Sequence, residues 1–173
     1  MENYSIHELS LNDGTDIYQM LKEIGPGENG FQNRAYDKTE AEFKNWLQSQ
    51  INMSKGIDLD PKLVPMTTYW LRHKGYPVGT SKLRCRLSEA LLINGGHIGF
   101  CIRPSERGKG YSSILLKETL KKAFLIGIES ALLTCDIGND PSWKTIEKCG
   151  GIIEKIENGR RYYWIKTKDT LLE

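Results

Sequence analysis

The sequence has few of the features that mark metal sites, secreted proteins or membrane proteins. Its 173 residues include only four cysteines, at Cys85, Cys101, Cys135 and Cys149. They form no C-x-x-C pair, and no histidine follows them at zinc-finger spacing, so we expect no metal site and reduced, mostly buried thiols. No apolar run is long enough to cross a bilayer, and the first residues are polar and acidic, unlike a signal peptide. These absences predict a soluble, cytoplasmic protein without a membrane partner.

The chain also lacks a block of charge of one sign, an internal repeat and a low-complexity tract. Its 24 basic and 22 acidic residues give a formal net charge of +2, and the basic residues are spread along the sequence. Nucleic-acid binders usually carry a basic stripe, so we expect no nucleic-acid partner. The apolar fraction of 39% is ordinary for a folded protein, and the length fits a single domain over residues 1–173.

Glycine and proline punctuate a pattern of alternating helices and strands. Two stretches rich in these residues, 25–30 and 55–65, are expected to be loops. Between them, Thr39 and Glu42 have the spacing of a capping box, which predicts the start of a helix. Further helices are expected from the glycine pair at 108 and 110 to Gly127, and from Asp140, as the cap, to the glycines at 150 and 151.

The predicted strands are short and mostly apolar. Asn158–Gly159 is a strong hairpin signal that joins the last two of them. The expected strands cover residues 66–73, 78–87, 96–102, 131–135, 152–157 and 160–166. With a strand expected before the helices, this order predicts an α/β fold, a mixed sheet flanked by helices.

The chemistry is concentrated in residues 95–117, where a strand runs through a glycine-rich turn into an apolar helix. Gly108 and Gly110 allow the backbone to approach a ligand without an intervening Cβ atom. The free N–H groups of the first helical turn form an anion site, and Arg107 and Lys109 add positive charge there. The segment therefore predicts a bound phosphate or pyrophosphate group.

Two common phosphate-binding motifs do not fit this turn. A P-loop requires glycine where the chain has Arg103, and Ser or Thr where it has Gly110. The dinucleotide fingerprint requires a third glycine where the chain has Ser113.

The turn instead resembles the acetyl-CoA site of the GCN5-related N-acetyltransferase (GNAT) superfamily, whose signature is Gln/Arg-x-x-Gly-x-Gly/Ala after the fourth strand. The resemblance implies a mixed, mostly antiparallel sheet of about seven strands flanked by about four helices. It also implies acetyl-CoA as cosubstrate and direct transfer of the acetyl group to a primary amine of a small molecule or peptide. By this resemblance the cofactor-binding residues are Phe100, Cys101, Ile102, Arg107, Gly108, Lys109, Gly110, Tyr111, Ser112, Asn139 and Ser142.

The chain departs from the family pattern at three positions. Ser105 stands where Gln or Arg is preferred, and Gly151 replaces an aromatic residue. Ile146 occupies the position of the tyrosine that protonates the leaving thiolate in many members. The proton donor is then Tyr111, another tyrosine such as Tyr162 or Tyr163, or water.

His97 is the candidate general base, because it aligns with a glutamate base on the fourth strand of histone-acetylating members and its ordinary pKa suits proton removal near neutrality. The alternative is a histidine satisfied inside the sheet. Glu28 and Glu89, which lie in or beside loops, are the next candidates for the base. Each is more simply interpreted as a solvated surface carboxylate. His97 and Cys101 would point to the same strand face, but nothing resembles an activating dyad, so a route through a Cys101 thioester is disfavoured.

The acceptor is not identified by any motif. Arg84 and Arg86 could bind an acidic acceptor, although a solvent-facing strand explains them equally well. Two other functions stay open: a fold that binds acyl-CoA as a sensor without catalysis, and a nucleotide-binding protein that uses the same turn. Homodimers that form through edge strands are common among similar proteins, and a homodimer is a further expectation for this chain.

Overall fold

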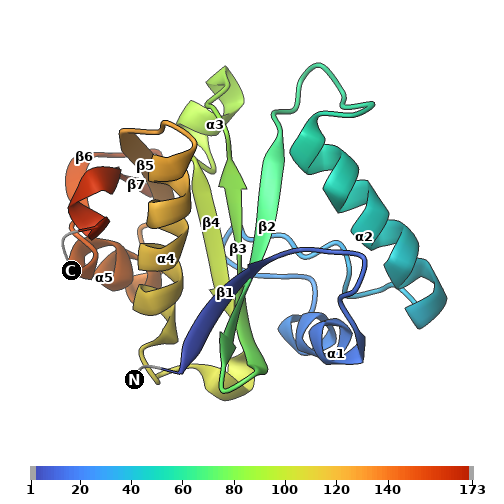
Figure 1. The fold of residues 1–173 in the computed structure, drawn as a ribbon. Helices are drawn as coiled ribbons and strands as arrows, with labels where there is room; N and C mark the ends of the chain where they lie inside the picture. Colours follow the sequence, from blue (N-terminus) through green and yellow to red (C-terminus); the bar gives the residue numbers. More distant parts are fainter. Residues whose placement is uncertain (1–2, 172–173) are drawn as a thin grey trace.

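The computed structural model describes residues 3–171, which form two antiparallel sheets with helices around them (Figure 1). The first sheet has the strand order β1-β2-β3-β4, and the second has the order β5-β7-β6. The strands are β1 Tyr4–Glu8, β2 Met66–His73, β3 Tyr76–Arg84, β4 Ile98–Ile102, β5 Ser130–Asp136, β6 Ile152–Glu157 and β7 Arg160–Lys166. The helices are α1 Thr15–Ile24, α2 Glu40–Lys55, α3 Glu89–Ile93, α4 Tyr111–Leu125 and α5 Asp140–Lys148, with 3₁₀ turns at Pro104–Glu106 and Thr167–Leu171.

Helices cover both faces of the first sheet. On one face, α1 and α2 pack over β2 and β3 around the fully buried Trp70 (Figure 1). On the other face, α4 packs its Leu116 and Leu120 against Leu83 of β3 and against side chains of the second sheet. Burying these large side chains stabilises the fold by roughly 1.5–3 kcal/mol each.

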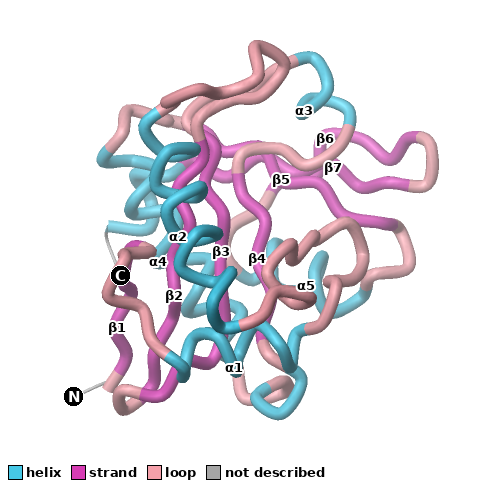
Figure 2. The backbone as a smooth tube through the Cα atoms, turned by 90° about the vertical axis from the view of Figure 1, so that its right-hand side faces the viewer, coloured by secondary structure: helices cyan, strands magenta, loops and turns pink. Residues whose placement is uncertain are grey.

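The two sheets are joined between the residues just before β4 and the middle of β5. His97 N donates to Leu132 O at 2.7 Å, and Leu132 N donates to His97 Nδ1 at 2.9 Å. The backbones are closest at Gly96, where an added Cβ would lie 2.3 Å from Leu132 O. Beyond this junction β4 and β5 diverge (Figure 2) and belong to separate sheets. The divergence opens a cavity between them.

Several predicted elements are confirmed at their predicted positions. The bounds of β2, β6 and β7 match the predicted strands, and the long helix lies between Gly110 and Gly127. The capping box is present, since Glu42 N donates to the Thr39 hydroxyl and Thr39 N donates to the Glu42 carboxylate.

Other boundaries were wrong. The strand expected at 78–87 spans Tyr76–Arg84, so Arg86 lies outside it. The next strand begins at Ile98 rather than residue 96, because Gly95 and Gly96 have φ angles of 115° and 61°, which do not continue a strand.

Two further corrections concern helices. The cap of α5 is Asn139, whose side chain accepts from Ser142 N, and Asp140 lies in the first turn. Between the strands expected at 78–87 and 96–102, where no element was predicted, lies the short helix α3, which begins because the Ser88 side chain caps it.

None of the helices in residues 3–171 combines the length and the apolar character that a membrane span requires. Within the same range, no three His, Cys, Asp or Glu side chains gather as a metal-binding group. Cys85 is exposed, the other three cysteines are buried, and none of the four is in a disulfide.

Candidate functional site

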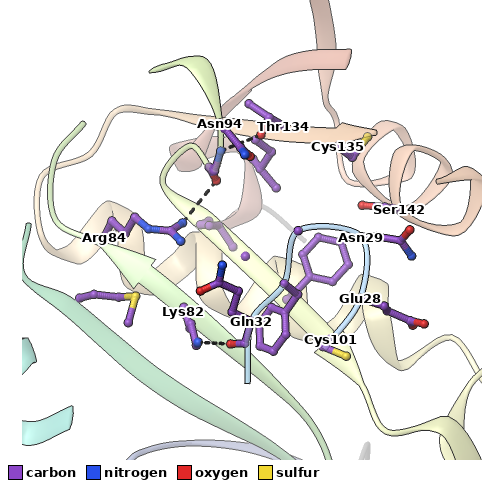
Figure 3. Close-up of a pocket in the computed structure, with 18 of the residues that line it drawn as sticks. Glu28, Asn29, Gln32, Lys82, Arg84, Asn94, Cys101, Thr134, Cys135 and Ser142 are labelled. Carbon is purple, nitrogen blue, oxygen red and sulfur yellow. Dashed lines mark hydrogen bonds between the residues drawn. The ribbon is translucent and has the colours of Figure 1, made fainter. Parts of the chain in front are cut away.

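A cavity of about 710 Å³ lies where β4 and β5 diverge (Figure 3). Its walls come from β4, the end of β5, the turn before α4 and the beginning of α5. The loop around residues 28–34 and one face of α2 complete the enclosure. Elements far apart in sequence thus build one site.

The glycine turn forms one end of the cavity. Gly108 and Gly110 line it with φ angles of 75° and 83°, and no atom lies within 4 Å of the position that a Cβ would take at either. Gly110 is the N-cap of α4 and has no side chain to cap the helix. The first N–H groups of α4 are therefore open to an anion, which the positive end of the helix dipole also attracts.

The predicted cofactor residues are brought together, with one exception. All of them except Lys109 line the cavity. Lys109 instead forms an ion pair with Glu106 at 2.9 Å, and its side chain is exposed.

Glu28 links the loop around residues 28–34, here called the covering loop, to the glycine turn. Its carboxylate lies 2.6 Å from Arg107 Nη2, while Arg107 Nε donates to Ile102 O at 3.1 Å. Glu28 therefore lines the cavity as the ionic partner of Arg107, and it holds the loop next to the predicted pyrophosphate site. Glu89, the other candidate carboxylate, lies on α3 and is not part of the cavity wall.

His97 is placed at the junction of the two sheets and does not line the cavity. Its Nδ1 accepts the Leu132 amide, so the ring proton of the neutral form lies on Nε2. Burial, together with the nearby charge of Arg84, lowers the pKa of His97 to about 4. These contacts are those of a histidine satisfied inside the sheet, the alternative that the sequence left open.

Cys101 lines the cavity from β4. Burial raises the pKa of the Cys101 thiol, which keeps it protonated near neutral pH. The Sγ atom is 3.6 Å from Ile102 O, and no histidine contacts it among the described residues. The geometry therefore offers no activated thiolate.

Of the three candidate tyrosines, only Tyr111 lines the cavity. Each of the three hydroxyl groups already has a partner: Tyr111 pairs with His73 Nδ1 at 2.8 Å, Tyr162 donates to Ile93 O, and Tyr163 donates to Glu147. Burial and Glu147 raise the pKa of Tyr163 to about 12.

The two departures in and after α5 are explained by their contacts. Ile146, where the resemblance implied a tyrosine, is 1% exposed and lines the cavity with an apolar side chain. A Cβ at Gly151 would lie 2.5 Å from Ile146 Cγ2 and 2.8 Å from Ile146 O, so no aromatic side chain fits there.

Sequence reasoning missed Lys82 and the wall that α2 contributes. Lys82 and Arg84 share the cavity face of β3, since they are two residues apart in a strand, and both line the cavity. The signal was available, because the predicted strand already placed Lys82 on the face of Arg84. The covering loop and Trp46, Gln50 and Met53 of α2 gave no such signal.

Comparisons with known proteins identify the fold. The family model for the acetyltransferase (GNAT) family matches residues 18–151. RimL, a ribosomal alpha-N-protein acetyltransferase solved in complex with coenzyme A, is 13% identical with a TM-score of 0.71, covering 96% of this chain and 95% of its own. The ribosomal-protein-S5-alanine acetyltransferase of Vibrio fischeri is 16% identical with a TM-score of 0.70, covering 98% and 96%.

A third similar structure is that of an enzyme named for a different kind of acceptor. It is a chimera of the spermidine N-acetyltransferase SpeG of Vibrio cholerae with hSSAT, 16% identical, with a TM-score of 0.63 over 99% of both chains. A search of curated protein sequences gives no significant match. The two antiparallel sheets and the helices around them thus match the fold of these acetyltransferases.

Proposed function

The chain belongs to the acetyltransferase (GNAT) family, and from that premise we propose that it transfers the acetyl group of acetyl-CoA to a primary amine. One observation carries the proposal: a single cavity contains both a glycine turn at a helix start and the open edge of β4. The turn offers N–H groups to a pyrophosphate, and a strand edge offers backbone groups to an amide-bearing arm. Acetyl-CoA has both parts, and the coenzyme A bound in the RimL structure supports this ligand.

The register of β4 selects the group that would stabilise the reacting carbonyl. Arg84 N donates to His97 O and Arg103 N donates to Val78 O, so the odd-numbered residues of this stretch pair with β3. Alternate residues of a strand point to opposite edges, so the N–H group of Phe100 points to the cavity side. We assign Phe100 N–H as the donor to the oxyanion that forms when the amine attacks the thioester.

The proton transfers are assigned to water. The described cavity wall contains no histidine, and its two carboxylates, Glu28 and Glu106, are both ion-paired. Attack by the neutral amine forms the C–N bond and the oxyanion, and the amine proton passes to water. Collapse of the oxyanion then breaks the C–S bond and releases the CoA thiolate, which solvent protonates. This route predicts a rate that rises with the fraction of neutral amine, without an inflection near pH 6.5.

The proposal is tested by incubating the protein with acetyl-CoA and a panel of primary amines. We expect free CoA thiol to appear only when an accepted amine is present, together with one equivalent of N-acetylated product measured by mass spectrometry. Binding of acetyl-CoA without amine-dependent thiol release across the panel would instead indicate a sensor that lacks catalysis.

Direct transfer makes a specific prediction for Cys101→Ser. Because the thiol is buried and its pKa is raised, it forms no acetyl-enzyme, and kcat/KM should stay within about threefold of the wild type. A route through an acetylated Cys101 would lose roughly 10³-fold or more, since the hydroxyl has no activating base. The two results are separated by steady-state kinetics with any accepted amine.

A further inference from the structure

The part of the cavity farthest from the glycine turn is lined by positive charge. Lys82 and Arg84 lie opposite the start of β4, whereas the glycine turn follows its end, and Arg34 and Lys62 also line the cavity. The lining carboxylates within the described residues are those of Glu28 and Glu106, which lie at the glycine turn. Figure 3 shows Lys82 and Arg84 on one side of the cavity and Glu28 on the other. Two further lining cations, Arg107 and Arg160, are paired with Glu28 and Asp136, each at 2.6 Å.

Lys82 and Arg84 are fixed on this wall by the packing of β3. The intervening Leu83 is buried on the opposite face, and Ser81 bonds to Thr119 of α4 at 2.7 Å on that same face. The side chains of Lys82 and Arg84 must therefore point to the cavity side of the strand.

Both cations are held by carbonyl oxygens rather than by carboxylates. Lys82 Nζ donates to Gln32 O at 2.5 Å and lies 4.9 Å from the centre of the Phe31 ring. Arg84 Nη1 donates to Gly95 O at 3.3 Å and Gly96 O at 3.2 Å. No carboxylate within residues 3–171 forms an ion pair with either side chain, although each has further N–H donors to offer.

The two positive charges are half-buried and close enough to affect each other. Burial, followed by the charges of Arg84 and Arg34, lowers the pKa of Lys82 to about 8, and burial lowers the pKa of Arg84. Half-buried cations without a counter-ion create a positive potential that an anion would relieve. A polycationic acceptor would be repelled from the same wall.

We propose that the acceptor amine carries an anionic group, a carboxylate or a phosphate, that Lys82 and Arg84 bind. This inference rests on the proposed function and adds to it the chemical class of the acceptor. The anion would anchor the far end of the molecule while its amine reaches the thioester beside Phe100. Arg86 does not line the cavity and takes no part.

The test uses four series of amines that differ only in the group at the far end, each with two to five methylenes: alcohol, carboxylate, phosphate ester and second amine. We expect kcat/KM for the better anionic series to exceed that for the alcohols by about 10- to 100-fold, and the diamines to be the poorest. The carboxylate and phosphate series distinguish the two sources of charge. Equal or better turnover of alcohols or diamines would overturn the proposal.

Substitutions at Lys82 and Arg86 test whether the preference for anionic amines depends on Lys82. Lys82→Gln should lose most of the preference for anions, chiefly through KM, and Lys82→Glu should shift it toward diamines. Arg86→Gln removes one positive charge from an exposed position outside the cavity and should leave the preference unchanged. If Lys82→Gln and Arg86→Gln behave alike, Lys82 is not the anchor.

Measuring acetyl-CoA binding shows whether a negative result contradicts the anionic acceptor alone or the proposed acetyltransferase function as well. Wild type and Lys82→Gln should bind acetyl-CoA equally well, so a protein that binds it but favours neutral or cationic amines contradicts only the inference. If no amine in the series is acetylated, binding of the same amines to the CoA-loaded protein is measured by calorimetry. The proposal is overturned if the anionic amines do not bind more tightly than the others.

Discussion

Gly110→Asp is expected to weaken acetyl-CoA binding by at least about 100-fold while the protein remains folded. Gly110 is the cap of α4 at a φ of 83°, and space is open where its side chain would be. Aspartate tolerates this left-handed conformation and favours a helix start, so the fold should be kept. Its carboxylate, however, would face a pyrophosphate at close range, and like charges about 4 Å apart repel by roughly 4 kcal/mol near a protein surface.

Gly110→Asn is the matched control, because it has nearly the same shape and no charge. Calorimetric titration should show a much smaller loss of affinity for Asn than for Asp, and both variants should melt within a few degrees of the wild type. Equal affinities for the Asp variant and the wild type would mean that no phosphate binds at this turn.

Substitution of His97 is expected to affect stability far more than catalysis. His97→Leu removes the acceptor of the Leu132 amide at the junction of the sheets and leaves a buried N–H group unsatisfied, at a cost of about 2–3 kcal/mol. His97→Asn can place its Oδ1 near the position of Nδ1 and should lose less. In chemical denaturation we therefore expect the order wild type, Asn, Leu in the free energy of unfolding.

The pH dependence of stability gives His97 a second signature. Its pKa is about 4 in the folded protein and about 6.5 when unfolded, so the unfolded chain binds more protons between these values. The free energy of unfolding should fall as pH decreases from 6.5 toward 4, by a His97 contribution that approaches about 3 kcal/mol. His97→Asn should lack this contribution, while the titrating carboxylates contribute equally to both proteins and cancel.

Kinetics of the same variant test the catalytic hypothesis. With His97 outside the cavity wall, His97→Asn should retain kcat/KM within about fivefold. A general base would contribute about 10²–10⁴-fold, and its loss would also remove an inflection from the pH–rate profile. A loss of that size with unchanged stability would restore His97 as the base.

The parts of the fold that were predictable depend on local chemistry. The capping box at Thr39, the Asn158–Gly159 hairpin and the glycine turn each require specific residues at short spacing, and the sequence displays them directly. The anion site could be predicted for the same reason, since a helix start after Gly110 is a local feature.

The remaining features depend on contacts between distant residues. Alignment along a strand suggested a base at His97, but its environment is set by Leu132, 35 residues away. The Arg107–Glu28 pair and the Lys82–Gln32 bond likewise join a loop to strands and turns far along the chain. Periodicity identifies the face on which a side chain lies, and only the tertiary structure shows what meets that face.

Thermal unfolding with and without acetyl-CoA tests the central claim most directly, with ATP and NAD as controls. Acetyl-CoA at 100 times its Kd should stabilise the protein by about 2.7 kcal/mol, which for a chain of this size raises Tm by roughly 5–10 °C. We expect this shift with acetyl-CoA and none of similar size with the two nucleotides. No shift at millimolar acetyl-CoA, or an equal shift with ATP, would contradict it.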